Sequence, residues 1–431
     1  MKKRKILSLV LTSLTAISLA ACGSSSSETD TDKVTIEIFN IKTETASQIQ
    51  NLIDEYEKDH ADVEINLTTV GGGQDATAAL KAKFASGDEP DIFMLAGLSD
   101  VKTYERYLAD QTDTDLISKA LPGTLDGATL DGKVLGAPVL IEGYGWMINQ
   151  TIFEKAGIKV EDIKSFADFK KAVETLDSKK DELGLKGVFA YSGDQADTWV
   201  SNQMSSHFIS EGFNNSLTET FEAKTFDFDV TGSKAMQDYV DLIVKYNAEP
   251  FQSMSYATSV QELFATGKAA IVHQGNWIVP TLNEMDPEFA KNDLAVLPTF
   301  GTGTNDGKYA VASSWYWGIN KTKGEGNQKA SEDFINWMYS NESAMDQVVN
   351  ELGYIPAYSN FDKNQISDPV SKTFFSALNE DKYVPWLHNS YPDGWGQNVM
   401  GIELQKYAQA EITWEEFVNT IEKDWNDKRS N

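Results

Sequence analysis

Cysteine, histidine and basic residues are scarce in this chain, and each shortage excludes a class of function. The 431 residues include one cysteine, four histidines and 37 Lys and Arg against 65 Asp and Glu, so the formal net charge is −28. One cysteine cannot form an internal disulfide, and with four histidines it does not supply a dedicated zinc cage. An acidic chain repels a phosphate backbone. We therefore expect no metal, no other cofactor and no nucleic-acid partner.

Long apolar runs are also missing after the N-terminus. No later stretch approaches the ~18 uninterrupted apolar residues of a membrane-spanning helix. The chain is 41% hydrophobic and 11% aromatic, which is typical of a folded protein and not of a disordered or low-complexity one. At ~150 residues per domain, its length predicts two or three domains.

The N-terminus carries a targeting signal. Lys2–Lys5 is basic, Ile6–Ala21 is mainly apolar but too short to span a bilayer comfortably, and Cys22 follows the small residues of a pattern that resembles a bacterial lipobox. An ordinary secretory peptide with a chance cysteine is the alternative. We expect residues 1–21 to be a signal peptide, Cys22 to be lipidated, and residues 22–33 to form a flexible tether. This places the protein on the outer face of the cytoplasmic membrane, most simply in a Gram-positive bacterium.

After the tether, strand-like and helix-like segments alternate. Val34–Phe39 has the alternation of a strand, and Thr45 with Gln48 three residues later predicts a capping box at the start of a helix. Val63–Leu67 and Asp91–Leu95 predict the next two strands, with a second helix between them. This order favours a parallel sheet with helices on both faces.

The pattern then breaks and resumes. Lys133–Tyr144 is extended and bears Gly and Pro, which is typical of a crossover between two parts of a fold. Ser165, with Asp168 three residues later, predicts another capped helix, and Gly187–Tyr191 and Ala269–His273 predict strands. We interpret the chain as two α/β lobes, and we expect the chain to pass from one lobe to the other more than once. The predicted boundaries are 34–140 with 295–345 for lobe 1, and 141–294 with 346–431 for lobe 2.

Several segments resemble one known family in their order and spacing. The chain is similar to the extracellular solute-binding proteins (family 1) of bacterial ATP-driven importers, in their carbohydrate-binding cluster, and within it to binding proteins for raffinose-type and α-1,6-linked oligosaccharides (multiple sugar-binding proteins). The segments that carry the resemblance are VTIEIFN (34–40), FASGDEPDI (84–92), 132–158, ELFATGKAAIVHQGNW (262–277), Leu297-Pro298, 315–321 and GYIPA (353–357).

The resemblance implies a fold, a ligand and partners. It implies a periplasmic-binding-protein-like α/β fold of two lobes, each a sheet flanked by helices, joined by a hinge with multiple crossovers. The protein would act as a monomer without catalysis, closing on an oligosaccharide and delivering it to two permease subunits driven by a cytoplasmic ATPase. Two alternatives stay open: a surface glycosidase, which needs two carboxylates at fixed separation, and a binder of metal, peptide or polyamine in the same fold.

Aromatic side chains in loops are the first candidates for a sugar site, because flat rings cover the apolar C–H faces of a sugar. The family resemblance favours Trp277 as a stacking residue, against a packing role. Trp315 and Trp317 share one face of a predicted crossover strand, and we expect at least one of them in the cleft. Trp199 and Trp395 lie in loop-like segments and are also assigned to the cleft.

Polar candidates lie where predicted strands end, because open α/β sheets bind ligands there. Carboxylates and amides suit sugar hydroxyls. Helix capping is an equal alternative for Asp75, and a hinge role is an equal alternative for Glu142 and Tyr144. Tyr144, in the predicted crossover segment, is included with these polar candidates. The predicted residues of this group are Lys42, Glu44, Gln74, Asp75, Glu142, Tyr144, Asn276, His388 and Asp393.

Overall fold

The structure is a computed structural model that describes residues 33–71 and 76–430. The predicted signal peptide, the lipidation residue Cys22 and almost all of the tether lie outside these residues, as do Gln74 and Asp75. Within the described ranges, no helix combines the length and the apolar character needed to cross a bilayer.

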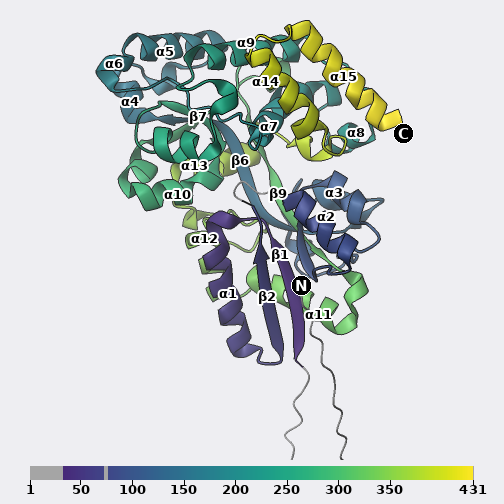
Figure 1. The fold of residues 1–431 in the computed structure, drawn as a ribbon. Coiled ribbons are helices and arrows are strands. Elements are labelled where there is room, and N and C mark those ends of the chain that lie inside the picture. The colour runs from purple at the N-terminus through teal and green to yellow at the C-terminus, as the bar shows by residue number, and fades with distance from the viewer. Residues whose placement is uncertain (1–32, 72–75, 431) are drawn as a thin grey trace, which may run out of the picture.

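Two halves of the molecule are connected by long strands (Figure 1). The strands are β1 Val34–Asn40, β2 Val63–Thr69, β3 Ile92–Leu95, β4 Thr129–Leu130, β5 Lys133–Val134, β6 Ala137–Asn149, β7 Ile271–Gly275, β8 Leu294–Leu297, β9 Tyr309–Ile319 and β10 Tyr383–Val384. The helices of the lower half are α1 Ala46–Asp59, α2 Ala76–Ser86, α3 Leu98–Tyr104, α11 Glu325–Met338 and α12 Glu342–Asn350. The helices of the upper half are α4 Gln150–Lys155, α5 Phe166–Ser178, α6 Lys180–Leu183, α7 Thr198–Ile209, α8 Leu217–Glu222, α9 Val230–Tyr246, α10 Val279–Met285, α13 Pro369–Asn379, α14 Ile402–Ala408 and α15 Trp414–Ser430.

The main sheet runs through both halves without interruption. Its order is β2-β1-β3-β9-β6-β7, with β10 paired to β9 and β8 paired to β6. β1 pairs in parallel with β2 and β3, as the alternation of strands and helices predicted, whereas β3, β9, β6 and β7 pair antiparallel. β6 and β9 are the longest strands and pass from one half to the other (Figure 1), so they form the predicted crossovers. The separate sheets expected for the two lobes are thus one hydrogen-bonded sheet.

The lower half, lobe 1, has an apolar layer on each face of its sheet. Ile36 and Ile38 of β1 face a cluster that includes Leu52 of α1 and Phe334 of α11. Phe39, the next residue along β1, faces the opposite cluster, formed with α2 and α3. Successive side chains of a strand alternate between faces, so the sequence of β1 by itself specifies a sheet covered on both sides.

Two segments near the predicted lobe boundaries pack in two different apolar clusters. Val296 of β8 lies in an apolar cluster with Phe264 and Leu282, on the side of the upper half, lobe 2. Val348 and Tyr354 pack instead in the lobe 1 cluster. We therefore propose that the chain returns to lobe 1 within β9 and leaves it after residue 358.

Two local predictions are wrong and one is confirmed. Thr45 does not cap α1 with its side chain; its hydroxyl lies 2.8 Å from the Tyr354 hydroxyl instead. Residues 187–191 do not form a strand, because the backbone N–H groups of Val188 and Phe189 both donate to the Tyr246 carbonyl and only isolated bridges form. Ser165 does cap α5, accepting from the backbone N–H of Asp168.

Candidate functional site

An aromatic cluster lies in lobe 2 beside the crossover strands. Trp277 is its centre: its ring centroid lies 6.0 Å from that of Trp386, 6.3 Å from that of Trp199 and 6.4 Å from that of Tyr144. Tyr256 continues the cluster at 5.9 Å from Trp199. We call Tyr144, Trp199, Tyr256, Trp277, Trp386 and His388 the aromatic cluster; the rings of Trp199, Tyr256 and Trp277 are only partly buried.

Two side chains hold the exposed indoles in orientation. The Nε1–H of Trp277 donates to Oε1 of Gln274 at 2.8 Å, and that of Trp199 donates to Oδ1 of Asp197 at 3.0 Å. The other Asp197 oxygen accepts from the backbone N–H of Tyr256. Burial raises the pKa of Asp197, although these two hydrogen bonds favour its charged form. The indole faces are thus presented in fixed positions while their N–H groups are already satisfied.

The deeper part of the cluster is formed by Tyr144, Trp386 and His388. Tyr144 donates to the Gln203 carbonyl at 2.6 Å, and the rings of Trp386 and His388 stack at 5.4 Å. Nδ1 of His388 lies 2.8 Å from the Ser206 hydroxyl, and burial lowers the pKa of His388 to about 3. The histidine is therefore neutral at pH 7 and acts as a planar, polar-edged ring.

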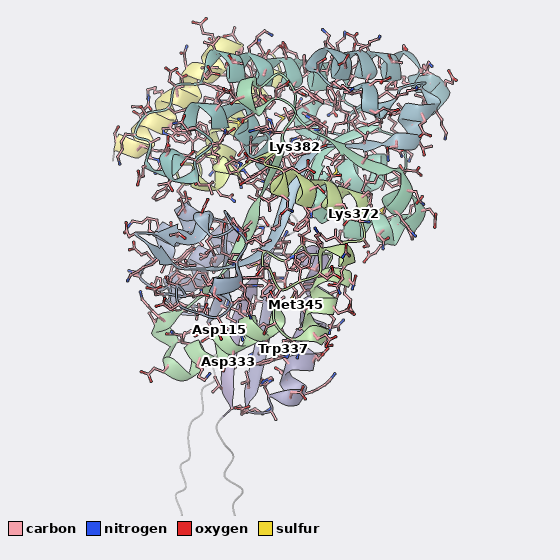
Figure 2. All side chains as sticks on the ribbon, turned by 180° about the vertical axis from the view of Figure 1, so that it is seen from behind. Asp115, Asp333, Trp337, Met345, Lys372 and Lys382 are labelled. Carbon is pink, nitrogen blue, oxygen red and sulfur yellow. The ribbon has the colours of Figure 1, made fainter. Side chains whose placement is uncertain are left out.

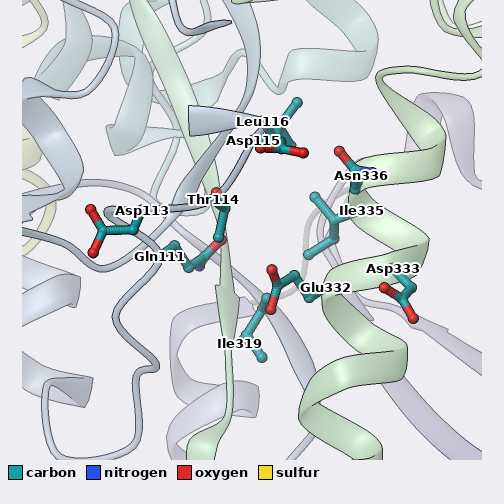
Figure 3. Close-up of a pocket in the computed structure, with 10 residues that line it drawn as sticks. All are labelled: Gln111, Asp113, Thr114, Asp115, Leu116, Ile319, Glu332, Asp333, Ile335 and Asn336. Atoms are coloured by element: carbon teal, nitrogen blue, oxygen red, sulfur yellow. The ribbon is translucent and has the colours of Figure 1, made fainter. Parts of the chain in front are cut away.

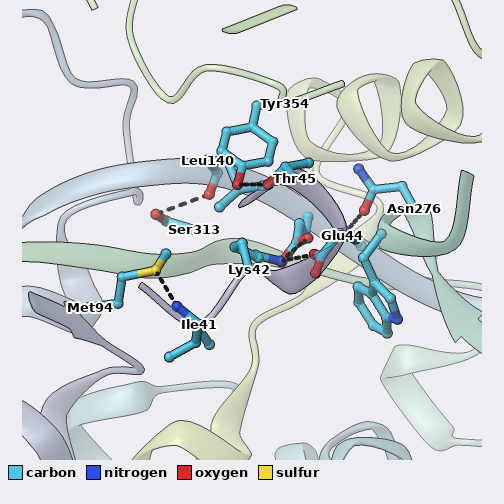
Figure 4. A network of polar contacts seen from close by, with 12 residues as sticks. Ile41, Lys42, Glu44, Thr45, Met94, Leu140, Asn276, Ser313 and Tyr354 are labelled. Carbon is cyan, nitrogen blue, oxygen red and sulfur yellow. Dashed lines mark hydrogen bonds and ion pairs between the residues drawn. The ribbon is translucent and has the colours of Figure 1, made fainter. Parts of the chain in front are cut away.

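Lobe 1 contributes a charged group next to the crossover strand β6 (Figure 4). Nζ of Lys42, which follows β1, lies 2.6 Å from Oε1 of Glu142 on β6 and 3.4 Å from Oε1 of Glu44. Burial alone would lower the pKa of Lys42, but the charges of Glu142 and Glu44 outweigh it and the pKa is raised. The Lys42–Glu142 pair is almost fully buried, whereas the Glu44 side chain is 24% exposed.

Electrostatics connect this group with the aromatic cluster. Burial raises the pKa of the Tyr256 phenol, and the next contribution comes from the nearby charge of Glu44. Glu142 and Tyr144 are two residues apart on β6 and share a face of the strand. Glu44 of lobe 1 is therefore close enough to Tyr256 of lobe 2 for its charge to act on the phenol.

The lobes also touch at a second place. The Ser99 hydroxyl of α3 donates to the Tyr391 carbonyl at 2.8 Å, and Lys81 of α2 forms an exposed ion pair with Asp393 at 2.9 Å. Asp393 thus connects the lobes at the surface, and its side chain is paired with Lys81 rather than directed at an aromatic ring.

Half of the predicted site residues belong either to the aromatic cluster or to the charged group beside β6. We call these two groups together the junction. The predicted residues in it are Lys42, Glu44, Glu142, Tyr144, Trp199, Trp277 and His388. Asn276 is adjacent but structurally engaged, since its side chain accepts from the backbone N–H of Gly143 and donates to Ser371.

Two predicted tryptophans lie in the cores of the lobes. Trp395 is 0% exposed in the lobe 2 core, where its Nε1–H donates to the Ile421 carbonyl and its ring meets Trp425 edge to face. Trp317 is buried in the lobe 1 core and donates to the Tyr339 hydroxyl. Trp315 is partly buried against the same core, and its place in the cleft stays a prediction.

Sequence reasoning missed Trp386 and Tyr256. Trp386 follows Pro385 in a loop after β10, so the criterion used for the other loop aromatics would have selected it. Tyr256 precedes a helical stretch, Thr258–Phe264, and its role depends on the contact with Trp199, which no local pattern shows. Its part in the site emerges only from the fold.

A separate cavity of about 320 Å³ lies in lobe 1, between residues 111–116 and α11 (Figure 3). Asp115 and Asp333 mark it in the lower half, seen from behind in Figure 2. Carboxylates dominate its rim, and aromatic rings are absent from its ten lining residues. In the part of the chain that the structure describes, no group of three or more His, Cys, Asp or Glu is arranged to hold a metal ion. The aromatic cluster is therefore the better candidate for an organic ligand.

The architecture and the site define the class of protein. The sequence matches the profile of the bacterial extracellular solute-binding proteins over residues 51–373. The chain belongs to this family, which confirms the predicted family. It also confirms the prediction of a binding protein, not an enzyme.

Individual relatives fit the same class. The multiple sugar-binding protein of Streptococcus mutans is 26% identical over 396 residues, 89% of each chain. The maltotriose-binding protein of Pyrococcus abyssi is 24% identical and covers 80% of this chain and 72% of its own. Among solved structures, a chitin oligosaccharide binding protein superposes with a TM-score of 0.78 at 20% identity, covering 93% of this chain and all of its own. RafE in complex with raffinose gives 0.74 at 18%, covering 92% and 100%. These structures confirm the two-lobed α/β fold.

Proposed function

We propose that the protein is the sugar-binding component of an ATP-driven importer and captures an oligosaccharide of raffinose, melibiose or isomalto type between its lobes. The observation that carries this proposal is the aromatic cluster, in which the partly exposed indoles of Trp199 and Trp277 contact each other and are oriented by side-chain hydrogen bonds. The relatives named for multiple sugars and for maltotriose support a sugar over other solutes.

The site has the groups that a sugar requires. The faces of Trp277 and Trp199 would cover the apolar faces of pyranose rings, and Glu44 would accept hydrogen bonds from hydroxyls. Nε1 of Trp386 and Nε2 of Gln274 are buried donors with no hydrogen-bond partner within the protein. Buried polar groups are normally paired, so these two donors support a ligand rich in hydroxyl oxygens.

Closure of the lobes would couple binding to transport. β6 and β9 are the connections on which the lobes would turn, and a ligand held by Glu44 and Trp277 together favours the closed form by its higher affinity for that form. The closed monomer would then dock on two permease subunits powered by a cytoplasmic ATPase. We keep the Lys42–Glu142 pair in the proposal as the group that holds Glu44 in position.

The N-terminal residues complete the proposal. Cleavage after residue 21 and lipidation of Cys22 would anchor the protein on the outer face of the cytoplasmic membrane of a Gram-positive bacterium, with residues 22–33 as a tether. A Cys22→Ala variant is expected to appear in the culture medium, whereas the native chain stays with the membrane fraction.

Calorimetric titration tests the ligand class. The mature chain is titrated with the melibiose, raffinose and stachyose series and with isomalto- and malto-oligosaccharides, and each mixture is checked for released monosaccharide. We expect saturable binding of at least one series without product. Absence of heat with every sugar would contradict the proposal, and enzyme-like release of monosaccharide would replace it with a glycosidase. Competition by spermidine would favour a polyamine binder.

A further inference from the structure

A shallow hollow of about 650 Å³ lies in lobe 2, beyond the aromatic cluster. It is widely open to solvent. Its lining is polar and combines two amides, a carboxylate and a hydroxyl. The residues that form it are Asp194, Gln195, Ala196, Gln252 and Ser253, and we call it the distal hollow.

The two segments that line the distal hollow continue directly into the aromatic cluster. The backbone N–H groups of Gly193 and Asp194 both donate to the Met254 carbonyl, so the segments lie side by side. A few residues further on, Asp197 connects them again by accepting from Nε1 of Trp199 and from the backbone N–H of Tyr256. The hollow and the outer rings of the cluster are therefore parts of one hydrogen-bonded unit.

The partly exposed rings form a short row of contacting pairs. Their centroids are 6.3 Å apart from Trp277 to Trp199 and 5.9 Å from Trp199 to Tyr256, whereas Trp386 is only 3% exposed. Trp199 and Tyr256 belong to the same unit as the distal hollow. A single pyranose ring can lie against only part of such a row, whereas a chain of linked units can follow it toward the hollow.

The chemistry of the hollow suits the end of such a chain. The amides of Gln195 and Gln252 donate and accept hydrogen bonds, which matches hydroxyl groups. Gln195 is exposed and Gln252 is partly exposed, so a ligand can reach both side chains. The hollow has one carboxylate on its lining, against four around the lobe 1 cavity, so it suits a neutral ligand better.

We propose that the distal hollow is a subsite for the terminal unit of an oligosaccharide of three or more units that lies along the row from Trp277 to Tyr256. This inference rests on the proposed sugar-binding function and extends it, because it assigns the protein a preference for longer chains. Gln195 and Gln252 are the residues that determine this preference, and the units nearer Trp277 bind independently of them.

Calorimetry on the mature chain tests the inference with two-, three- and four-unit members of each series named above. In the native chain we expect the affinity to rise at least tenfold from the two-unit to the longest sugar. In the double variant Gln195→Ala/Gln252→Ala this rise should disappear while the affinity for the two-unit sugar stays unchanged. Both side chains lie at the surface of the hollow, so the variant is expected to fold, and its unfolding curve checks this.

Gln328→Ala, on α11 of lobe 1, is the matched control and should keep the full rise. A native chain without the rise, or a double variant that retains it, would overturn the distal subsite while leaving sugar binding intact. If no sugar of any length binds, the proposed function itself fails and the subsite fails with it.

Discussion

Lobe 2 contains two groups of tryptophans that differ in what their rings still expose. Trp395 and Trp425 are fully buried, meet edge to face at 4.9 Å, and lie among the side chains of the lobe core. Trp199 and Trp277 also have their N–H groups satisfied, but by the side chains of Asp197 and Gln274, and their rings remain partly exposed. The comparison shows that a loop position does not leave a tryptophan ring uncovered. In the proposed site, the candidate contacts are the rings that are oriented and still partly exposed.

The buried tryptophans predict the largest effect, which is a loss of folding stability. Trp395→Ala removes a fully buried ring, and large-to-small changes of this kind cost about 3–5 kcal/mol. We expect the free energy of unfolding, measured with denaturant, to fall by that amount. The folded fraction should bind sugar with native affinity. A large loss of affinity in folded Trp395→Ala would place this ring in the site and break the comparison.

The Lys42–Glu142 ion pair predicts the next loss of folding stability, which comes from an unpaired buried charge. Lys42→Met leaves the carboxylate of Glu142 buried without its partner, and an uncompensated buried charge costs on the order of 3 kcal/mol. We expect this loss in denaturant unfolding. The double variant Lys42→Met/Glu142→Gln, which removes both charges, should recover most of it. If the double variant is as unstable as Lys42→Met alone, the loss does not come from the unpaired charge.

Lowering the pH should separate the core from the site. Burial lowers the pKa of His207 to about 4 and that of His273 to about 3. Below pH 6.5 the unfolded chain binds protons that the folded chain refuses, so stability falls by about 1.4 kcal/mol per histidine and pH unit. We expect the free energy of unfolding to decrease from pH 7 to pH 5. Sugar affinity should stay constant, because His388 is also neutral there.

The pH dependence has its own control. His207→Gln/His273→Gln should remove the part of the decrease between pH 7 and pH 5 that comes from these two histidines and leave the part from His388, whose pKa burial also lowers to about 3. An unchanged slope in this variant would show that other groups cause the loss. A sugar affinity that falls with pH in the native chain would show that the site itself titrates.

The partly exposed tryptophans predict the smallest free-energy change, which is a change in the free energy of sugar binding. Trp277→Ala removes a stacking face, which is worth ~1–3 kcal/mol, or a ~10- to 100-fold loss of affinity. Trp337→Ala is the matched control. This tryptophan is also partly buried, but it belongs to α11 and packs against the lobe 1 core. We expect calorimetry to show native affinity for the control. Equal losses in both variants would mean that Trp277 acts through folding.

Local patterns predicted the first strands and helices of lobe 1 because β1, α1 and β2 carry their own periodicity and β3 is a short, continuous apolar run. The family and the two-lobed fold were also predictable, from ordered motifs along the chain. The site was predictable where a side chain follows a strand, as with Lys42 and Trp277.

The remaining parts of the site depend on contacts between distant segments. The Pro and Gly around Trp395 predict an exposed turn, yet the ring is covered by Phe226 and Trp425, from other parts of the chain. Tyr256 enters the site only because Asp197 holds its backbone beside Trp199. The boundaries that we propose near β9 and residue 358 likewise depend on which core each segment joins.

A crystal structure of the mature chain with a bound sugar from the tightest-binding series tests the central claim most directly. The account predicts electron density for sugar rings against Trp277 and Trp199, with a hydroxyl within hydrogen-bond distance of Glu44. Density confined to the carboxylate-lined cavity between residues 111–116 and α11, or contacts with Trp395 in place of Trp277, would contradict it.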